Sequence, residues 1–304
     1  MKEIRLGGVL PVSPIALGCM RMASLSEREA EKVIMTALEC GITFFDHADI
    51  YGGGRSEEIF GNVLRSHPGL REKINMQSKC GIRKGYYDAS KEHILQSVDG
   101  ILSRLGVDSL DTLLLHRPDA LMEPAEVAEA FEELSRSGKV RYFGVSNENS
   151  AQLALLENAM PGRIRINQMQ FGLAHTGMVD AGINVNIHSD HAVVRDGRVL
   201  DYCRLHGITI QAWSPFQYGM FEGVFLKSEK YRTLNEEIAK ISAAYGVTDS
   251  AVAVAWILRH PAGIQTIIGS MNPGRIQEIA KAQEIQLTRQ EWYQLYLAAG
   301  NPLP

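Results

Sequence analysis

The sequence predicts a (β/α)8 barrel, in which eight parallel strands alternate with helices. Short segments that are apolar throughout are separated by stretches long enough for a helix, as parallel strands covered on both faces require. Several segments also run directly into a polar residue, and the C-terminal strand ends of such a barrel meet at one mouth that holds the active site. The expected strands are residues 15–18, 42–46, 74–79, 111–116, 140–146, 164–169, 208–213 and 264–269.

The first elements carry local signals for their boundaries. Residues 4–11 alternate around a glycine pair and are expected to form a hairpin that closes the bottom of the barrel. The first helix is predicted to begin at Ser26, because Ser26 and Glu29 have the spacing of a capping box. Ser56 is expected to cap the second helix.

Later helices are bounded by capping and breaking residues. A helix is predicted to begin at Ser90 and to end at Gly106, a residue suited to the left-handed C-terminal position. Pro124 fits the first position of the next helix. Another apolar helix is expected to be capped by Thr248 with Asp249 and to stop before Pro261.

Two long insertions, residues 172–197 and 215–232, follow the sixth and seventh strands and are expected to line the mouth as long loops. The second insertion is unusually apolar for a surface loop, and we expect it to fold over a bound cofactor as a lid; its large apolar residues are Phe216, Tyr218, Met220, Phe221 and Phe225. No linker or low-complexity run divides the chain, so residues 1–304 are expected to form one domain.

The composition excludes several classes of function. The 304 residues are 45% hydrophobic and 22% charged with a net charge of −4, which indicates a soluble protein without attraction to nucleic acid or anionic membranes. Residues 1–4 lack the layout of a signal peptide, and no run approaches the ~18 apolar residues of a membrane span. The four cysteines show no CxxC pairing, so we expect reduced thiols in a cytoplasmic protein.

The structural alternative is a doubly wound open sheet. Such a sheet would carry a GxGxxG turn after its first strand. Neither the glycine at position 18 nor the triplet at residues 52–54 has that spacing. The barrel is therefore the preferred prediction.

Four polar residues at or after strand ends have complementary chemistry. Tyr51 is a phenol with a reference pKa near ~10, too high for ready proton exchange at neutral pH. The Lys79 ammonium would stabilise the phenolate and lower that pKa, and Asp46 would keep Lys79 charged and oriented. A neutral His116 can donate a hydrogen bond to a carbonyl oxygen. Such a set transfers a proton to an oxygen as hydride arrives, so a cofactor must supply the hydride.

Other interpretations of these residues are weaker. Asp46, His47 and Asp49 resemble the ligands of a metal-dependent barrel hydrolase, but neighbouring strand residues face opposite sides, so Asp46 and His47 should not both point inward. The histidines of residues 175–191 lack a register that supports a metal site, and no metal is expected. Taken alone, Lys79 could be an ordinary surface lysine. The four polar residues with complementary chemistry, each at or after a strand end, together argue against this interpretation.

The chain resembles the aldo-keto reductase family, and in particular its bacterial oxidoreductase branch. Residues 41–52 are similar to the family's Asp/Tyr signature, residues 78–81 to its lysine strand and residues 115–119 to its histidine strand. Residues 136–147 match its fifth-strand signature. The likeness runs over residues 15–280, nearly the whole chain.

The resemblance implies a function and a role for each residue. The chain would reduce aldehydes or ketones with NADP(H), with Tyr51 as the general acid, Lys79 and Asp46 tuning it, and His116 orienting the carbonyl. The residues expected to bind the cofactor are Ser146, Asn147 and Gln168 at the nicotinamide carboxamide, Trp213 stacked on the nicotinamide, Ser214 to Gly219 along the pyrophosphate, Ser270 and Arg275 at the 2′-phosphate, and Glu278 near the adenine. Trp213 fits a core aromatic as an alternative.

One position departs from many family members. Gly269 stands where lysine is common, so the preference for the phosphorylated cofactor depends mainly on Arg275, and NAD(H) use remains open. The expected partner is a small carbonyl substrate, without nucleic acid or membrane, and the expected state is a monomer or weak homo-oligomer.

Two other functions fit the same barrel. One is an NADP(H)-binding sensor or regulatory module with little turnover, as in the potassium-channel beta subunits of the family. Such a module is expected to carry an extra N-terminal inactivation-type segment or a partner domain, and neither is evident in this sequence. The other is an isomerase or hydrolase, which would need a metal or a different acid–base pair.

Overall fold

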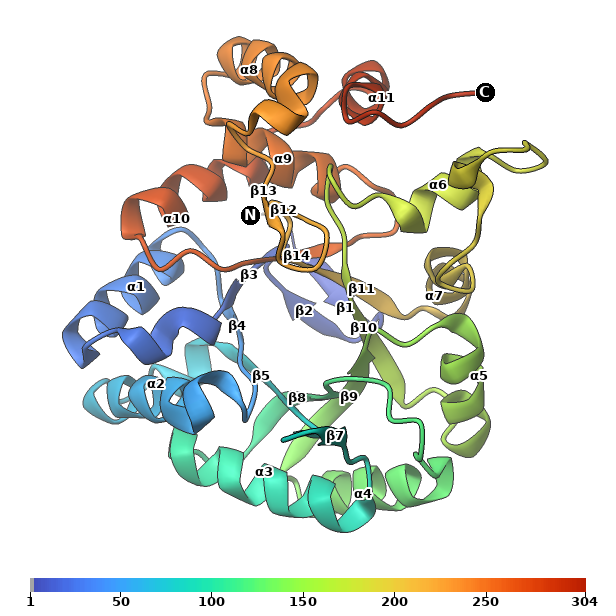
Figure 1. Cartoon of the computed structure of the whole chain (residues 1–304). Helices are drawn as coiled ribbons and strands as arrows, with labels where there is room; N and C mark the ends of the chain where they lie inside the picture. Colours follow the sequence, from blue (N-terminus) through green and yellow to red (C-terminus); the bar gives the residue numbers. More distant parts are fainter. Residues whose placement is uncertain (1–2) are drawn as a thin grey trace.

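The structure is a computed structural model that describes residues 3–304, so residues 1–2, the first half of the start that lacks a signal-peptide layout, lie outside the described residues. Its parallel strands form a closed barrel, which confirms the predicted fold class (Figure 1). The order around the barrel, returning to the first strand, is β3 (Ile15–Gly18), β4 (Phe44–Asp46), β5 (Asn75–Cys80), β8 (Leu110–Leu115), β9 (Val140–Ser146), β10 (Ile164–Gln170), β11 (Thr209–Trp213) and β14 (Gln265–Ile268). Each predicted strand overlaps one of them.

Helices form the outer ring of the barrel (Figure 1). Seven of them are the last α-helix before the next barrel strand, namely α1 (Glu27–Glu39), α2 (Arg55–Ser66), α3 (Lys91–Leu105), α4 (Pro124–Arg136), α5 (Ser150–Ala159), α7 (Val199–His206) and α9 (Asp249–Leu258), and α10 (Pro273–Ala280) follows β14. The others are α6 (Gly177–Ile183), α8 (Arg232–Tyr245) and α11 (Arg289–Ala298). No single helix among residues 3–304 is long and apolar enough to cross a membrane, and one pair (229–245 with 249–258) passes that test only together, across a bend of 92°.

Most predicted helix caps are confirmed. Ser26 forms a complete capping box with Glu29 at the start of α1. The Ser90 hydroxyl accepts the backbone N–H of the third residue of α3, and Gly106 ends that helix in the left-handed region with φ 66°. Pro124 is the first residue of α4.

The prediction for Ser56 was wrong. The N-cap of α2 is Gly54, at φ 96°, because the left-handed glycine turn brings the chain into the helix earlier. Ser56 lies inside the first turn, where its Oγ donates to the carbonyl of Cys19 at 2.8 Å and accepts the N–H of Ala23 at 3.1 Å. Its hydroxyl therefore joins α2 to the loop after β3. Thr248 does occupy the N-cap of α9, but its side chain makes no capping hydrogen bond.

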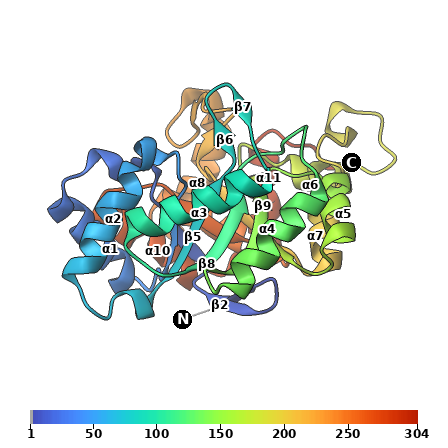
Figure 2. The same cartoon turned by 90° about the horizontal axis from the view of Figure 1, so that it is seen from below.

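The predicted N-terminal hairpin is confirmed and closes the lower end of the barrel. β1 (Ile4–Leu6) pairs antiparallel with β2 (Leu10–Val12). Its apolar side chains join residues of the barrel strands in a buried cluster of Leu6, Leu10, Val12, Ala16, Phe44, Leu114, Ile166 and Ile267. Figure 2 shows this hairpin on the side opposite the hairpin of β6 (Ile82–Arg83) and β7 (Tyr86–Tyr87). The mouth therefore lies at the β6–β7 end.

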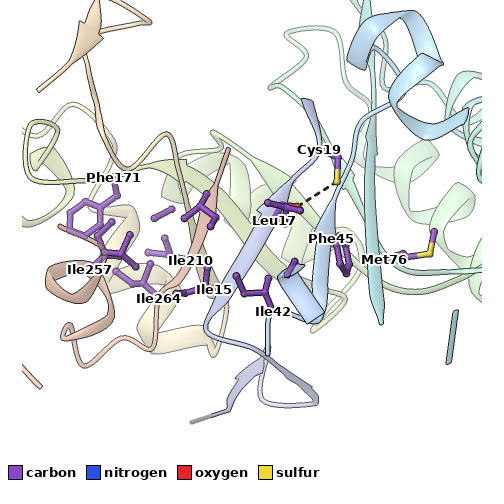
Figure 3. Packing of buried hydrophobic residues seen from close by; sticks show 14 of the residues in the cluster. Ile15, Leu17, Cys19, Ile42, Phe45, Met76, Phe171, Ile210, Ile257 and Ile264 are labelled. Atoms are coloured by element: carbon purple, nitrogen blue, oxygen red, sulfur yellow. Dashed lines mark hydrogen bonds between the residues drawn. The ribbon is translucent and has the colours of Figure 1, made fainter. Parts of the chain in front are cut away.

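The main core lies between the barrel and the helices. Side chains that point outward from the strands, such as Ile15, Phe45 and Ile210, meet apolar residues of the helical layer with almost no exposed surface (Figure 3). Trp256 of α9 stacks on Trp292 of α11 at 4.7 Å, and each indole N–H donates to the other residue's carbonyl. Close packing on both faces makes the strand ends a rigid base for side chains at the mouth.

The two long insertions contain regular structure. Residues 172–197 include α6, and residues 215–232 include an antiparallel hairpin of β12 (Gln217–Tyr218) and β13 (Gly223–Val224). In this second insertion Phe225 is fully buried, whereas Met220 and Phe221 are 62% and 54% exposed. The apolar set is therefore divided between a docked base and an open tip.

Candidate active site

The four residues predicted to act together do converge at the mouth. Asp46 ends β4, Lys79 lies near the end of β5, and His116 directly follows β8. Tyr51 opens the turn Tyr51–Gly54 after β4. The loop that carries Tyr51 is tied to the next strand, because the backbone N–H of Asp49 donates to the carbonyl of Lys79 at 3.0 Å.

Lys79 is the centre of the cluster. Its Nζ lies 2.8 Å from both carboxylate oxygens of Asp46 and 3.1 Å from the Tyr51 hydroxyl, and it also donates to the carbonyl of His47 at 2.8 Å. The Lys79 side chain is fully buried. The interpretation as a surface lysine is therefore wrong, and the ammonium is held between a carboxylate and a phenol.

The pKa values of this pair follow from burial and charge together. Burial opposes the charge of Lys79, but Asp46 and Tyr51 outweigh it and raise the pKa of Lys79 above its ordinary value. Burial also raises the pKa of Tyr51, while the Lys79 ammonium acts in the opposite direction and Asp46 adds to the increase. We expected a lowered phenol pKa; the effect of Lys79 has the expected sign, but burial is larger. Tyr51 is thus protonated at neutral pH.

His116 is neutral and faces Tyr51. Their rings are 5.9 Å apart and nearly perpendicular, at 81°. Burial first, and then the charges of Lys79 and Arg117, hold the pKa of His116 well below its ordinary value. A neutral imidazole with its pKa held down can donate one N–H without taking the proton from Tyr51.

A metal pair at Asp46 and His47 is not formed. His47 points away from the barrel interior and towards the helices. There its ring packs edge-on against Phe60 of α2, with 4.6 Å between the ring centres. Burial and then Lys79 lower the pKa of His47 to about 3. Within residues 3–304, no three His, Cys, Asp or Glu side chains are grouped so that they could hold a metal ion, the histidines of the 172–197 insertion included.

The residues expected around the nicotinamide are joined by hydrogen bonds. Ser146 Oγ donates to the carbonyl of Gln168 at 3.0 Å and accepts from Asn147 Nδ2 at 2.8 Å. Trp213 Nε1 donates to Asn147 Oδ1 at 3.3 Å. Asn147 is held at φ 61°, a conformation that asparagine adopts more readily than most residues. The strand ends of β9, β10 and β11 thus form one polar shelf beside the Tyr51 cluster.

Gln168 also has partners inside the barrel. Its Nε2 donates to Asp46 Oδ1 at 3.1 Å and to Gln211 Oε1 at 3.0 Å, so its amide N–H groups point into the barrel. Its Oε1 makes no hydrogen bond to any other residue in the range 3–304. This oxygen is the part of Gln168 that remains for a ligand at the mouth.

Trp213 is half-buried at the mouth, so the core-aromatic interpretation does not fit it. Phe221, at the tip of the β12–β13 hairpin, stacks over its ring at 6.0 Å, and the Arg117 guanidinium lies 5.8 Å from the ring centre. The hairpin tip is held by Gln170, whose Nε2 donates to the carbonyl of Gly219 at 2.9 Å. Ser214, at φ 48°, starts the turn into this hairpin.

Three residues at this end of the barrel had no assigned role in the sequence. Arg117 and Gln170 line the mouth next to predicted residues, a position that only the folded chain reveals. Glu148 directly follows Asn147 and is fully buried, with no hydrogen-bond partner for its carboxylate oxygens among residues 3–304. Burial raises the pKa of Glu148 to about 7. In the sequence, the one feature that could have pointed to Glu148 is its position directly after the fifth-strand signature of residues 136–147.

The residues expected at the adenosine end lie apart from the Tyr51 cluster, with Ser270 on the β14–α10 connection and Arg275 and Glu278 in α10. Ser270 Oγ accepts the N–H of Asn272 at 3.2 Å, and Glu278 pairs with Lys281 at 3.2 Å. Arg275 is exposed and has no ion-pair partner within residues 3–304. A Cβ built on Gly269 would meet no atom within 4 Å, so there is open space for a side chain at this position.

Two clefts lie elsewhere on the molecule. One lies beside α4 and is lined mainly by charged residues such as Lys91 and Glu129, and the other lies near the end of α2 around His67. Neither contains a predicted site residue, and neither places a proton donor beside a buried cation. The mouth remains the candidate site.

Comparisons with known proteins agree with this geometry. The family model described as the aldo/keto reductase family matches residues 14–296. The chain is 37% identical to the uncharacterized oxidoreductase YcsN of Bacillus subtilis, over 100% of both chains, and 36% identical to a 6-dehydroglucose reductase of Agrobacterium fabrum, over 99% of both. The crystal structure of an aldo/keto reductase from Klebsiella pneumoniae, in complex with NADP and acetate, is 26% identical and has a TM-score of 0.79, covering 100% of this chain and 97% of that chain. With the barrel and its Asp, Tyr, Lys and His constellation in place, the chain belongs to the aldo/keto reductase family of oxidoreductases.

Proposed function

We propose that this protein reduces aldehydes or ketones to alcohols with NADPH, and that Tyr51 is the general acid. The observation that carries the proposal is the buried contact of 3.1 Å between the Tyr51 hydroxyl and Lys79 Nζ, with Asp46 behind it. Such an arrangement suits a site in which a carbonyl oxygen gains negative charge and takes up a proton. The NADP-bound relative with the same fold supports the choice of cofactor.

The chemistry of the four residues follows from their geometry. When bound, NADPH supplies the hydride that the side chains of the chain cannot supply. Tyr51 donates its proton to the carbonyl oxygen, and Lys79 stabilises the phenolate that remains. Asp46 keeps Lys79 charged inside the barrel. His116, neutral because its pKa is low, donates an N–H to the same carbonyl oxygen and orients it.

The polar shelf fits a nicotinamide carboxamide. Gln168 Oε1 has no partner among residues 3–304 and would accept an amide N–H, while Ser146 and Asn147 offer polar groups next to it. The half-buried ring of Trp213 offers a flat surface for the nicotinamide. Further residues would follow the length of the cofactor: Ser214 to Gly219 beside the pyrophosphate, Ser270 and Arg275 at the 2′-phosphate, and Glu278 near the adenine.

The test is NADPH oxidation against a broad panel of aldehydes and ketones, with NADH run in parallel and Tyr51→Phe as the matched inactive control. The expected result is turnover of part of the panel by the wild-type protein and none above background by the variant. Bound NADPH whose fluorescence does not decay with any carbonyl would refute catalysis and favour the sensor function. Equal turnover by the variant would remove Tyr51 from the proton-donating role.

A further inference from the structure

Four glutamines line the barrel interior beneath Asp46. Gln77, Gln168, Gln211 and Gln265 come from four strands, and each is at most 4% exposed. Bulky apolar residues dominate the interior layers of such barrels. A buried amide costs free energy unless its groups are hydrogen-bonded, so the partners of these glutamines indicate why amides are present.

Two of the amide groups converge on Asp46. Gln77 Nε2 donates to Asp46 Oδ1 at 2.6 Å and to Gln211 Oε1 at 2.8 Å. Gln168 Nε2 donates to the same two oxygens, at 3.1 and 3.0 Å. Asp46 Oδ1 is therefore held by two neutral N–H donors in addition to Lys79.

The orientation of the Gln77 amide is fixed by the partners of its carbonyl oxygen, on the side away from Asp46. Its Oε1 accepts from Thr112 Oγ1 at 3.0 Å and from Gln211 Nε2 at 3.2 Å. Gln211 Nε2 also donates to Gln265 Oε1 at 2.8 Å. Gln265 Nε2 is the last donor of this series of hydrogen bonds and donates to the carbonyl of Ser13 at 2.7 Å. Reversing the Gln77 amide would bring its carbonyl oxygen against the carboxylate and its NH2 group against another NH2 group. The network permits one arrangement.

We propose that Gln77, with its amide oriented by Gln211, is a positioning residue that holds Asp46 Oδ1, so that the Asp46 charge stays paired with Lys79 and Lys79 stays on Tyr51. This inference rests on the proposed function. Both glutamines are fully buried; Gln77 donates to Asp46, and Gln211 contacts Gln77, so both act through Asp46 and not on a substrate. An ionised carboxylate inside a barrel needs donors in place of water, and Lys79 alone would leave Oδ1 underpartnered.

The ionisable groups that face Asp46 are Lys79, Tyr51 and Cys19. Burial first, and then Asp46, raise the pKa of Cys19 well above its ordinary value, so this thiol is neutral. Tyr51 is neutral as well. His47 and His116 lie beyond Lys79, and burial keeps both uncharged. Lys79 is thus the cation in this group, and the glutamine amides supply the remaining stabilisation of the carboxylate.

Two substitutions at one position test the inference in opposite directions. Gln77→Met removes the donor and keeps the size, so Asp46 takes up a proton at higher pH; we expect kcat to fall about tenfold or more at low pH and to approach wild type as pH rises. Gln77→Glu places a second carboxyl against Asp46, and two such groups retain a shared proton. That variant keeps activity at low pH and loses it as pH rises. KM should change little in either variant.

Gln265→Met is the matched control, because Gln265 is equally buried and in the same network but does not touch Asp46. It should lower stability without changing the shape of the kcat–pH profile. Identical pH-independent losses in Gln77→Met and Gln265→Met would overturn the inference. If Gln77→Met does not fold, Thr112→Val removes only the hydroxyl that fixes Gln77 Oε1, and its profile should shift in the same direction.

A second readout needs neither cofactor nor turnover. The carbon-13 resonance of the Asp46 carboxyl, assigned with Asp46→Asn, can be titrated in the free protein. We expect proton uptake in Gln77→Met about one pH unit or more above that in wild type and in Gln265→Met. Coincident titrations refute the positioning role even if the enzyme is active. Absence of carbonyl reduction by the wild type would refute the proposed function and leave this titration as a separate test.

Discussion

Lys79→Met is the substitution that most directly tests the proton-donating system. The change removes an ammonium 3.1 Å from the Tyr51 hydroxyl and keeps most of the buried stem. At an effective dielectric constant of about 20, two unit charges at that distance attract by roughly 5 kcal/mol. The phenol carries only part of a negative charge in the transition state, so about half of this energy is lost on substitution. A loss of roughly 2–3 kcal/mol lowers kcat about 30- to 150-fold.

The pH dependence gives the second part of this test. Without Lys79, burial and the charge of Asp46 act on Tyr51 unopposed, so the phenol pKa rises further above its ordinary value. Reduction needs protonated Tyr51, and the alkaline limb of kcat should therefore move to higher pH. Continuous NADPH assays from pH 6 to about pH 11.5 would measure both effects. A kcat within threefold of wild type, or an unmoved alkaline limb, would refute the role of Lys79.

Folding must be separated from chemistry in this variant. Removing one partner of a buried ion pair costs about 3–5 kcal/mol of stability, because Asp46 is left as an uncompensated charge. The double variant Asp46→Asn with Lys79→Met removes that charge and should recover much of the thermal stability. It should not recover kcat, since no cation remains beside Tyr51.

Four further predictions concern other parts of the molecule. Tyr51→Phe should lower kcat about 10²- to 10⁴-fold with NADPH affinity within a few-fold, and a tenth of wild-type kcat would contradict it. Arg275→Ala should weaken the binding of NADPH about 10- to 150-fold and that of NADH little, and adding Gly269→Lys, for which there is open space, should restore the preference for NADPH. Equal losses of affinity in titrations with the two cofactors would show that Arg275 does not bind the 2′-phosphate. NADPH should slow protease cleavage within 215–232, at the exposed tip of the hairpin, and equal rates would show a static wall that shapes substrate selectivity without closing. Burial raises the pKa of Glu148 from 4.5 to about 7, so the folded state keeps its proton longer than the unfolded state, and up to about 3 kcal/mol of stability should be lost as pH rises from 4.5 to about 7; denaturation of Glu148→Gln should lack this dependence.

Much of the fold was predictable because its signals are local. Apolar segments long enough for buried strands alternate with helices whose first turns carry their own caps, as at Ser26 and Ser90. A cap of this kind depends on atoms three residues apart, so the sequence contains both partners. Ser56, by contrast, was misassigned as a cap, because the partners of its hydroxyl, Cys19 and Ala23, are more than 30 residues away in the sequence.

The gathering of Asp46, Tyr51, Lys79 and His116 was also predictable, since a parallel barrel brings the C-terminal ends of all its strands to one mouth. The partners inside the barrel were not. Gln77 and Gln211 are 134 residues apart, and alternation along a strand says that each points inward without saying which inward groups meet. That choice depends on the closure and stagger of the barrel. The net pKa shift of Tyr51 has the same origin, because burial is a property of the assembled structure and here it exceeds the effect of the neighbouring ammonium.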